Sequence, residues 1–136
     1  MVQQKEIIIP EHPRGYHLIT PYIEKSLENL PPCGLLHVFI KHTSAGITLN
    51  ENADASVRAD FSFFFDNLVP ENQRFYTHTL EGADDLPAHL KSSIIGQSVV
   101  VPITNSRLNL GTWQGIYFCE FRNHGGPRHI VLTVLS

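Results

Sequence analysis

The alternation of apolar and polar positions predicts a chain made mostly of short strands. Runs rich in β-branched and aromatic residues are separated by turns that contain Pro or Gly, as in His12-Pro13-Arg14-Gly15. In the run over residues 35–42, a period of two places Leu36, Val38 and Ile40 on one face. We predict strands over residues 2–9, 16–19, 35–42, 47–49, 75–80, 97–101, 107–111, 115–122 and 128–135.

Three other segments have helical signals. Thr20-Pro21 predicts an N-cap and first turn, and Pro31-Pro32 ends that helix. A second helix begins after a cap at Asn52 or Asp54 and ends before Pro70, and a third runs over 86–95 after Asp84 or Asp85. The second helix carries an apolar stripe that we expect to be core, made of Val57, Phe61, Phe64, Phe65 and Leu68.

Helices among many strands predict the α+β class. The 136 residues lack a linker or a low-complexity segment, so we expect a single compact domain over 1–136. Its sheet should be mostly antiparallel or mixed, with two to three helices packed against it. In residues 116–122 the alternation places Phe118, Glu120 and Arg122 on one face. Cys119 lies on the other face, as a small buried apolar side chain.

Charge and composition exclude several classes of protein. Ten Lys and Arg against 13 Asp and Glu give a net charge of −3, which does not favour binding to nucleic acid. No apolar run approaches the roughly 20 residues that cross a bilayer. The segment Met1–Glu6 is polar and lacks the apolar core of a signal peptide. With two cysteines in no disulfide pattern, we expect a cytoplasmic protein.

The charged fraction is unusually low. It is 17%, against roughly 25% in average domains. A surface with few charges indicates that part of it is covered, most simply by other copies of the chain. Phe63 lies off the apolar stripe of its helix, and we expect it at a subunit interface.

Eight histidines supply the residue type that most often ligates metals and transfers protons. His42 and His124 each end a predicted strand before a turn of small residues, His78 lies in a predicted strand, and His89 lies in the third helix. Their spacing matches no local metal motif, so ordinary surface or part-buried histidines are the alternative. We expect His42, His89 and His124 to converge on one ion, with His78 as a fourth ligand or beside the ligands.

A polar loop precedes the second helix. Asn50, Glu51 and Asp54 place two carboxylates and an amide within five residues. One acidic residue is enough to cap the helix. We therefore treat Asn50, Glu51 and Asp54 as candidate catalytic residues, with a general base or metal ligand among them, and keep capping as the alternative.

A second candidate region resembles an anion site. Glycines around the only Trp allow backbone N–H groups to approach an anion, and an arginine can bind phosphate with two hydrogen bonds. A Gly-rich hairpin is the alternative. Ser44 follows His42, but no G-x-S-x-G motif marks it as a nucleophile. The candidate substrate- or anion-binding residues are Ser44, Arg107, Gly111, Thr112, Trp113, Gln114 and Arg122.

Four ordered motifs resemble those of the YjbQ-like family, described as a secondary thiamine-phosphate synthase family. They are H-T-S-A-G-I-T-L-N-E-N-A-D from His42, H-T-L-E-G-A-D-D-L-P-A-H from His78, L-G-T-W-Q-G-I-Y from Leu110, and C-E-F-R-N-H-G-G from Cys119. Together they extend the resemblance over nearly the whole chain.

The resemblance implies a compact α+β domain that forms a homotrimer and holds a divalent metal ion, zinc or magnesium, among its histidines. It also implies an enzyme that joins pyrimidine and thiazole phosphates with release of pyrophosphate, and therefore a phosphorylated small-molecule substrate. Two alternatives remain: a metal-dependent hydrolase of a phosphorylated metabolite, and a non-catalytic trimer that binds a metabolite or a metal.

Overall fold

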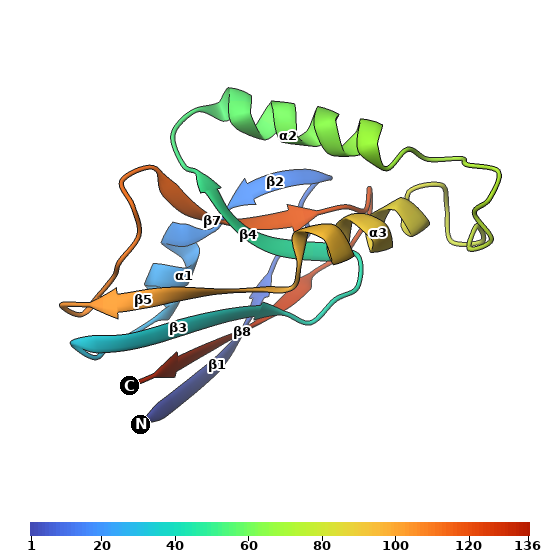
Figure 1. The fold of residues 1–136 in the computed structure, drawn as a ribbon. Coiled ribbons are helices and arrows are strands. Elements are labelled where there is room, and N and C mark those ends of the chain that lie inside the picture. Colours follow the sequence, from blue (N-terminus) through green and yellow to red (C-terminus); the bar gives the residue numbers. More distant parts are fainter.

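Antiparallel strand pairing organises the molecule. The computed structural model describes residues 1–136 and contains eight strands and three helices (Figure 1). A five-stranded sheet has the order β1-β8-β3-β5-β6, and a three-stranded sheet has the order β2-β7-β4. The strands are β1 (Val2–Ile9), β2 (Gly15–Leu18), β3 (Cys33–Ile40), β4 (Ala45–Glu51), β5 (Ser98–Thr104), β6 (Arg107–Leu108), β7 (Gln114–Glu120) and β8 (Arg128–Leu135).

The helices are α1 (Thr20–Ser26), α2 (Ala55–Leu68) and α3 (Asp85–Ile95). The predicted α+β class with antiparallel sheets is thereby confirmed. None of the three helices is both long and apolar enough to cross a membrane. Asp54 caps α2 as predicted, because its carboxylate accepts a hydrogen bond from Ser56 N at 2.9 Å. Thr20 is no cap: Ile19 takes that position, and Thr20 Oγ1 accepts instead from Ile116 N in β7 at 2.7 Å.

The main core lies between the two sheets. Leu36 and Val38 of β3 pack with Ile47 of β4, Phe118 of β7 and Ile23 of α1, and all five side chains are fully buried or nearly so. Burial of this apolar surface is the main stabilising contribution to the fold. The period-two faces predicted for β3 and β7 are the faces that pack here.

A smaller core covers the other face of the three-stranded sheet. Tyr117 and Cys119 of β7 are fully buried there beside Tyr16, as predicted for Cys119. Phe61 and Phe65 of α2 pack against this cluster, with the Tyr16 and Phe61 rings 5.6 Å apart. The molecule thus has three layers: the large sheet, the small sheet, and an outer layer of α2 and α3 (Figure 1).

The apolar stripe of α2 is less buried than predicted. No residue of this helix is buried, and Phe64 and Leu68 are 58% and 54% exposed. The reason is the width of the support: the sheet under α2 has three strands, and β2 has only four residues. Within the stripe, only Phe61 and Phe65 therefore pack against the small core. Phe63 is 75% exposed, so it is accessible for the subunit interface at which we expect it.

Residues 75–80 do not form the predicted strand. They lie in an irregular segment between α2 and α3 that has no neighbouring strand to pair with. Phe75 is 77% exposed and Leu80 is 96% exposed, although the Tyr76 hydroxyl donates to Pro70 O. β-Branched and aromatic residues favour a strand only where backbone partners are available. This segment carries His78 toward the start of α3.

Candidate metal-binding site

Two of the histidines predicted as metal ligands meet an aspartate at the start of α3. The ligand atoms of His78, Asp85 and His89 all lie within 4.8 Å of one another. Asp85 Oδ2 lies 2.5 Å from His78 Nε2 and 3.1 Å from His89 Nε2, between the two rings. The helix explains half of this arrangement, because residues 85 and 89 are one turn apart on the same face. The irregular segment before α3 supplies His78.

His89 is held with one ring nitrogen directed at this group. Its Nδ1 donates a hydrogen bond to Thr43 O at 2.9 Å, just before β4. A neutral imidazole that donates through Nδ1 leaves Nε2 without a proton and with a free lone pair. Metal-ligating histidines are commonly oriented by such a bond to a backbone carbonyl. His89 therefore has the orientation of a ligand: a proton on Nε2 bonds to Asp85 Oδ2, and a bound ion would take the place of that proton.

Asp85 is fixed from its other side by Arg122. Its Oδ1 accepts from Arg122 Nη1, while Arg122 Nε donates to Asp84 Oδ2 at 2.9 Å and Nη2 donates to Glu81 O at 3.0 Å. Burial raises the pKa of Asp85, but the hydrogen bond from His78 and the Arg122 charge outweigh it, so the pKa is lowered. Asp85 is thus an ionised carboxylate whose Oδ2 faces the two imidazoles.

The charge of the group suits a cation. Glu81 Oε2 lies 2.9 Å from His78 Nε2, so three carboxylates surround the two imidazoles and one guanidinium. With neutral histidines, three negative charges (Glu81, Asp84, Asp85) against one positive charge (Arg122) leave two negative charges. Glu81 is exposed, but Asp84 and Asp85 are buried and share the single Arg122 guanidinium, so one negative charge is buried without a partner, which favours a bound cation.

The donor set fits a transition-metal ion. Ligand atoms about 2.0–2.1 Å from a tetrahedral zinc ion lie roughly 3.3 Å apart. The spacing of 3.1 Å between His89 Nε2 and Asp85 Oδ2 is close to this value, whereas His78 Nε2, at 2.5 Å from Asp85 Oδ2, would have to move outward to admit the ion. Two imidazole nitrogens favour zinc over magnesium, which prefers oxygen ligands. Three protein ligands would leave a fourth position open, and His78 is 44% exposed on its side chain.

The structure does not bring His42 and His124 into this group, contrary to the predicted convergence. His42 Nε2 accepts a hydrogen bond from His129 N at 2.8 Å, so that nitrogen is occupied. Burial, and then the charge of Arg128, lower the pKa of His42. His124 is exposed in the loop after β7, because the strand ends at Glu120 and the predicted alternation does not continue to residue 124.

The polar loop lies at the other end of β4. Glu51 Oε1 accepts from Ala53 N and Asp54 N, each at 3.3 Å, and Asn50 Oδ1 accepts from Glu51 N. These bonds shape the turn that begins α2, which is the capping alternative. Six residue steps of β4 separate Ala45 from Glu51, or about 20 Å at the rise of a strand. Asn50, Glu51 and Asp54 therefore do not share a cleft with His89.

The Gly-rich turn also belongs to that far end. Asn52 Nδ2 donates to Thr112 O and Gln114 O, and Gln114 Oε1 accepts from Gly111 N. Trp113 is 64% exposed on this fixed turn. Asn105 and Ser106 form the hairpin turn before Arg107, both with positive φ. Arg107 is exposed on the short strand β6.

Two predicted anion-binding residues have structural partners instead. Ser44 is buried, and its Oγ lies 3.0 Å from Arg128 Nη2, whose guanidinium pairs with the fully buried Glu120. Arg122 uses Nε and both terminal nitrogens on the 81–85 segment. Arg122 thus serves to position Asp85, whereas Glu120, predicted on the same face, pairs with Arg128.

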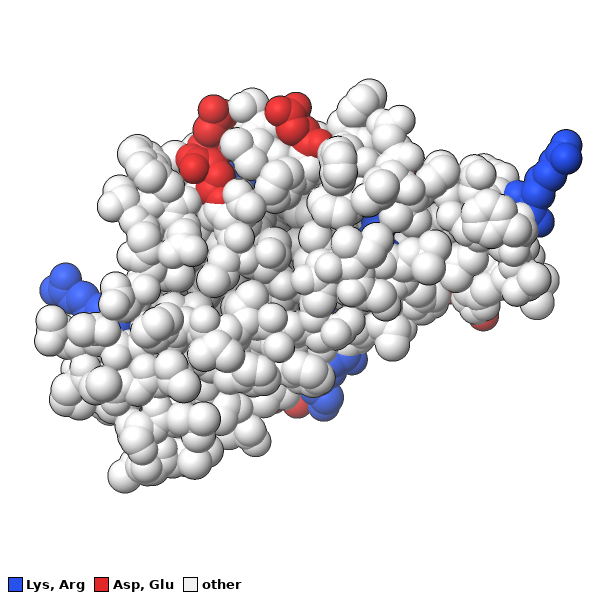
Figure 2. Space-filling view, viewed as in Figure 1, with Lys and Arg blue, Asp and Glu red and all other residues white.

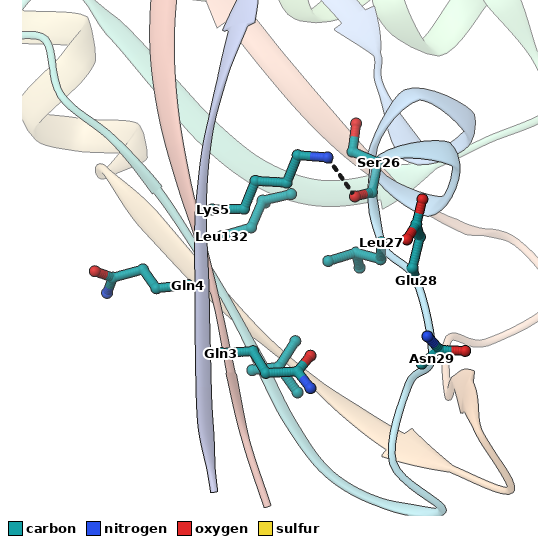
Figure 3. A pocket seen from close by; sticks show the side chains of 9 residues that line it. Gln3, Gln4, Lys5, Ser26, Leu27, Glu28, Asn29 and Leu132 are labelled. Atoms are coloured by element: carbon teal, nitrogen blue, oxygen red, sulfur yellow. Dashed lines mark hydrogen bonds between the residues drawn. The ribbon is translucent and has the colours of Figure 1, made fainter.

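The cavity between β1 and α1 carries no histidine. It has a volume of about 360 Å³, and its lysine, Lys5, donates to Ser26 O at 3.1 Å (Figure 3). Glutamine, asparagine and leucine side chains make up much of its wall. This cavity lacks the ligands that a transition metal needs.

Sequence reasoning missed Asp85 as a member of the site. The sequence indicates it only as a candidate helix cap. The signal was the spacing Asp85-x-x-x-His89 at the start of a predicted helix, which places a carboxylate and an imidazole on one face. The contact with Thr43 carried no such signal, because 46 residues separate it from His89.

Comparisons with known proteins give one consistent family. The chain matches the family described as "UPF0047 protein YjbQ-like" over residues 5–136. It is 52% identical to the UPF0047 protein YjbQ of Salmonella typhimurium over 136 residues, which cover 98% of each chain. The UPF0047 protein YugU of Bacillus subtilis is 48% identical over 95 residues, which cover 70% of this chain and 67% of that protein.

Solved structures share the fold. A YbjQ-like protein of unknown function from Sulfolobus solfataricus superimposes with a TM-score of 0.86 over 100% of this chain and 98% of its own, at 24% identity. An uncharacterized conserved protein of the yjbq/upf0047 family from Clostridium acetobutylicum superimposes with a TM-score of 0.79, at 35% identity, and covers 96% and 99% of the two chains.

These names correct one prediction. The expectation of thiamine-phosphate synthase activity is wrong, because the relatives carry only the description UPF0047 protein and none carries a synthase activity. The geometry adds a physical reason. The arginines expected to hold pyrophosphate are either paired within the protein, as Arg122 is, or lie on β6, as Arg107 does.

Proposed function

The chain belongs to the YjbQ-like UPF0047 family, and we propose that it binds a zinc ion through His78, Asp85 and His89. One observation carries the proposal: both Nε2 atoms point at the same oxygen, Asp85 Oδ2, and each of these three ligands has a restraint of its own. Thr43 orients His89, Arg122 orients Asp85, and Glu81 stands beside His78.

This arrangement supports a site with an open coordination position. A metal that keeps an open position can bind a water molecule or another small ligand directly. The chain's own residues would keep the Asp85 carboxylate ionised, because its pKa is lowered. Glu81, whose Oε2 lies 2.9 Å from His78 Nε2 and whose side chain is 58% exposed, could accept a hydrogen bond from a molecule in that position.

We also propose that the protein is a cytoplasmic homotrimer. The outer face of the five-stranded sheet supports the assembly, because its rows are rich in exposed apolar side chains. Val2, Leu135 and Leu35 align across three strands, and Phe39 and Val100 lie on the same face. Few charged groups appear on the face of the molecule shown in Figure 2. Cys33 and Cys119 are unpaired, which suits a reducing compartment.

A zinc titration tests the metal proposal. Tag-free protein titrated with zinc in a calorimeter should bind one ion per chain. Asp85→Asn and His89→Ala should each weaken binding by roughly 100-fold or more, since loss of outer-shell partners alone costs about 10–100-fold. His124→Ala is the matched control, because His124 is exposed outside the group. Full zinc occupancy in His89→Ala would refute the ligand assignment, and unfolding of that variant would show a structural role instead.

A further inference from the structure

A surface cavity adjoins the metal site on the far side of His89. Its volume is about 380 Å³, and its wall includes His42 and Thr43, the His89 ring, and Ser93 of α3. His89 therefore separates two regions: its Nε2 faces the Asp85 group, while its Nδ1 is bonded to Thr43 O at the cavity wall. Only the His89 ring would separate a ligand in this cavity from the proposed ion.

Most of the cavity surface is apolar, and hydrogen-bond donors stand among the polar groups on its wall. No carboxylate lines it, and its charged lining residue is Lys41, whose Nζ also contacts Glu6 Oε1 at 3.0 Å. An ammonium has three donor hydrogens, so the contact with Glu6 leaves others free. Thr43 and Ser93 add exposed hydroxyl-bearing side chains. These donors suit oxygen atoms that carry negative charge, and the apolar remainder of the wall suits the carbon part of a small molecule.

His42 is the least replaceable donor of the set. The His129 N–H points at His42 Nε2 at 2.8 Å, which is possible only if Nε2 has no proton. A neutral His42 must then carry its proton on Nδ1. That Nδ1 makes no hydrogen bond within the protein, and it is not among the buried polar atoms without a partner, which are Tyr16 Oη and Arg58 Nη1. The Nδ1–H group is therefore accessible to a ligand.

From this geometry we infer that the cavity binds the oxyanion group of a small molecule, a carboxylate or a phosphate, with His42 Nδ1–H as a fixed donor. His42 acts as a binding residue here, and not as the metal ligand predicted from the sequence. Burial beside Arg128 lowers the pKa of His42, and this keeps the ring neutral and the tautomer fixed. Only the position beside the ion rests on the proposed zinc site, since the donors belong to the protein itself.

Nuclear magnetic resonance of zinc-free, ¹⁵N-histidine-labelled protein tests this inference apart from the metal proposal. At neutral pH, His42 should show the Nδ1–H tautomer. Titration with inorganic phosphate and, separately, with acetate should shift the His42 Nδ1 resonance in at least one of the two series. The series that shifts identifies the oxyanion that the cavity prefers. An Nε2–H tautomer, or a His42 signal that neither anion moves, would overturn the inference.

Two substitutions separate binding from folding. His42→Gln keeps an acceptor for the His129 N–H but has no donor at the Nδ1 position, so anion binding should weaken about tenfold, the loss expected for one hydrogen bond to a charged group. His42→Asn places an amide donor near the Nδ1 position and should retain more of the affinity. Zinc binding should be unchanged in both variants. Equal anion affinity in His42→Gln and the unaltered protein would refute the role of His42, even if zinc binds as proposed.

Discussion

The Asp85 carboxylate contacts both histidines of the proposed metal site and the arginine that supports it. Its Oδ2 faces two imidazoles, and its Oδ1 meets a guanidinium that also holds Asp84 and the backbone of Glu81. The site's two histidines, His78 and His89, could be predicted from the sequence as candidate ligands. Asp85 could not be ranked above other acidic residues, because Arg122, the partner that fixes it, lies 37 positions away.

Arg122→Lys tests the supporting role of that guanidinium. A lysine keeps the charge but cannot hold Asp84, Asp85 and the Glu81 carbonyl at once. Zinc affinity should fall by about 10–100-fold, because Asp85 would lose its fixed orientation. Competition with a chromophoric chelator measures this change. Arg107→Lys, on β6, is the control and should bind zinc normally; an equal loss in both variants would contradict the role assigned to Arg122.

Strands could be predicted from the sequence where a neighbouring strand or the core is available to pair or pack with them. The strands β3, β7 and β8 follow their alternation, since each pairs on both sides or packs a regular face into the core. Residues 75–80 have the composition of a strand and no strand beside them, so they stay irregular. The apolar stripe of α2 fails for a similar reason: the helical period fixes which residues share a face, but the width of the supporting sheet decides how many are buried.

The loop between β7 and β8 supplies a prediction about stability. A Cβ atom at Gly125 would lie 2.6 Å from Glu120 Cδ and 2.7 Å from Arg128 Nη2, which form a buried ion pair. Gly125→Ala should therefore lower the free energy of unfolding by about 3 kcal/mol, because the pair must separate inside the protein.

Urea denaturation measures that difference. Gly111→Ala is the control, since its Cβ would meet only the flexible end of Gln114. It should change the free energy of unfolding by less than about 0.5 kcal/mol, as surface substitutions usually do. Equal stability of Gly125→Ala and the unaltered protein would mean that the loop moves aside and that the ion pair does not depend on the close approach.

At the scale of the whole molecule, the polar motifs divide between two places. The histidine group lies by the start of β4, and the Asn50–Asp54 loop with its fixed Trp turn lies by the end. Sequence order alone places His42 and Glu51 nine positions apart and suggests one cleft. The extended strand between them separates the two groups, and only the sheet pairing of β4 with β7 reveals that the Trp turn joins the second group.

The exposed apolar face of the five-stranded sheet predicts that the whole molecule assembles into a trimer. Analytical ultracentrifugation at micromolar concentration should report about three times the chain mass of 15.3 kDa. Val100→Glu places a charge on that face, where Val100 is 51% exposed, and should dissociate the trimer while leaving the chain folded. Phe63→Ser tests α2 as the alternative interface. A monomer at all concentrations of the unaltered protein would contradict the proposed assembly.

The central claim is that one ion lies between His78, Asp85 and His89. Diffraction from zinc-soaked crystals, recorded on both sides of the zinc absorption edge, locates zinc atoms directly. We expect an anomalous peak about 2.0–2.2 Å from Asp85 Oδ2 and from the Nε2 atoms of both histidines, with a fourth coordination position that no protein ligand fills. A peak bound to His42 or His124 instead, or no peak at a zinc concentration that saturates the calorimetric titration, would contradict it.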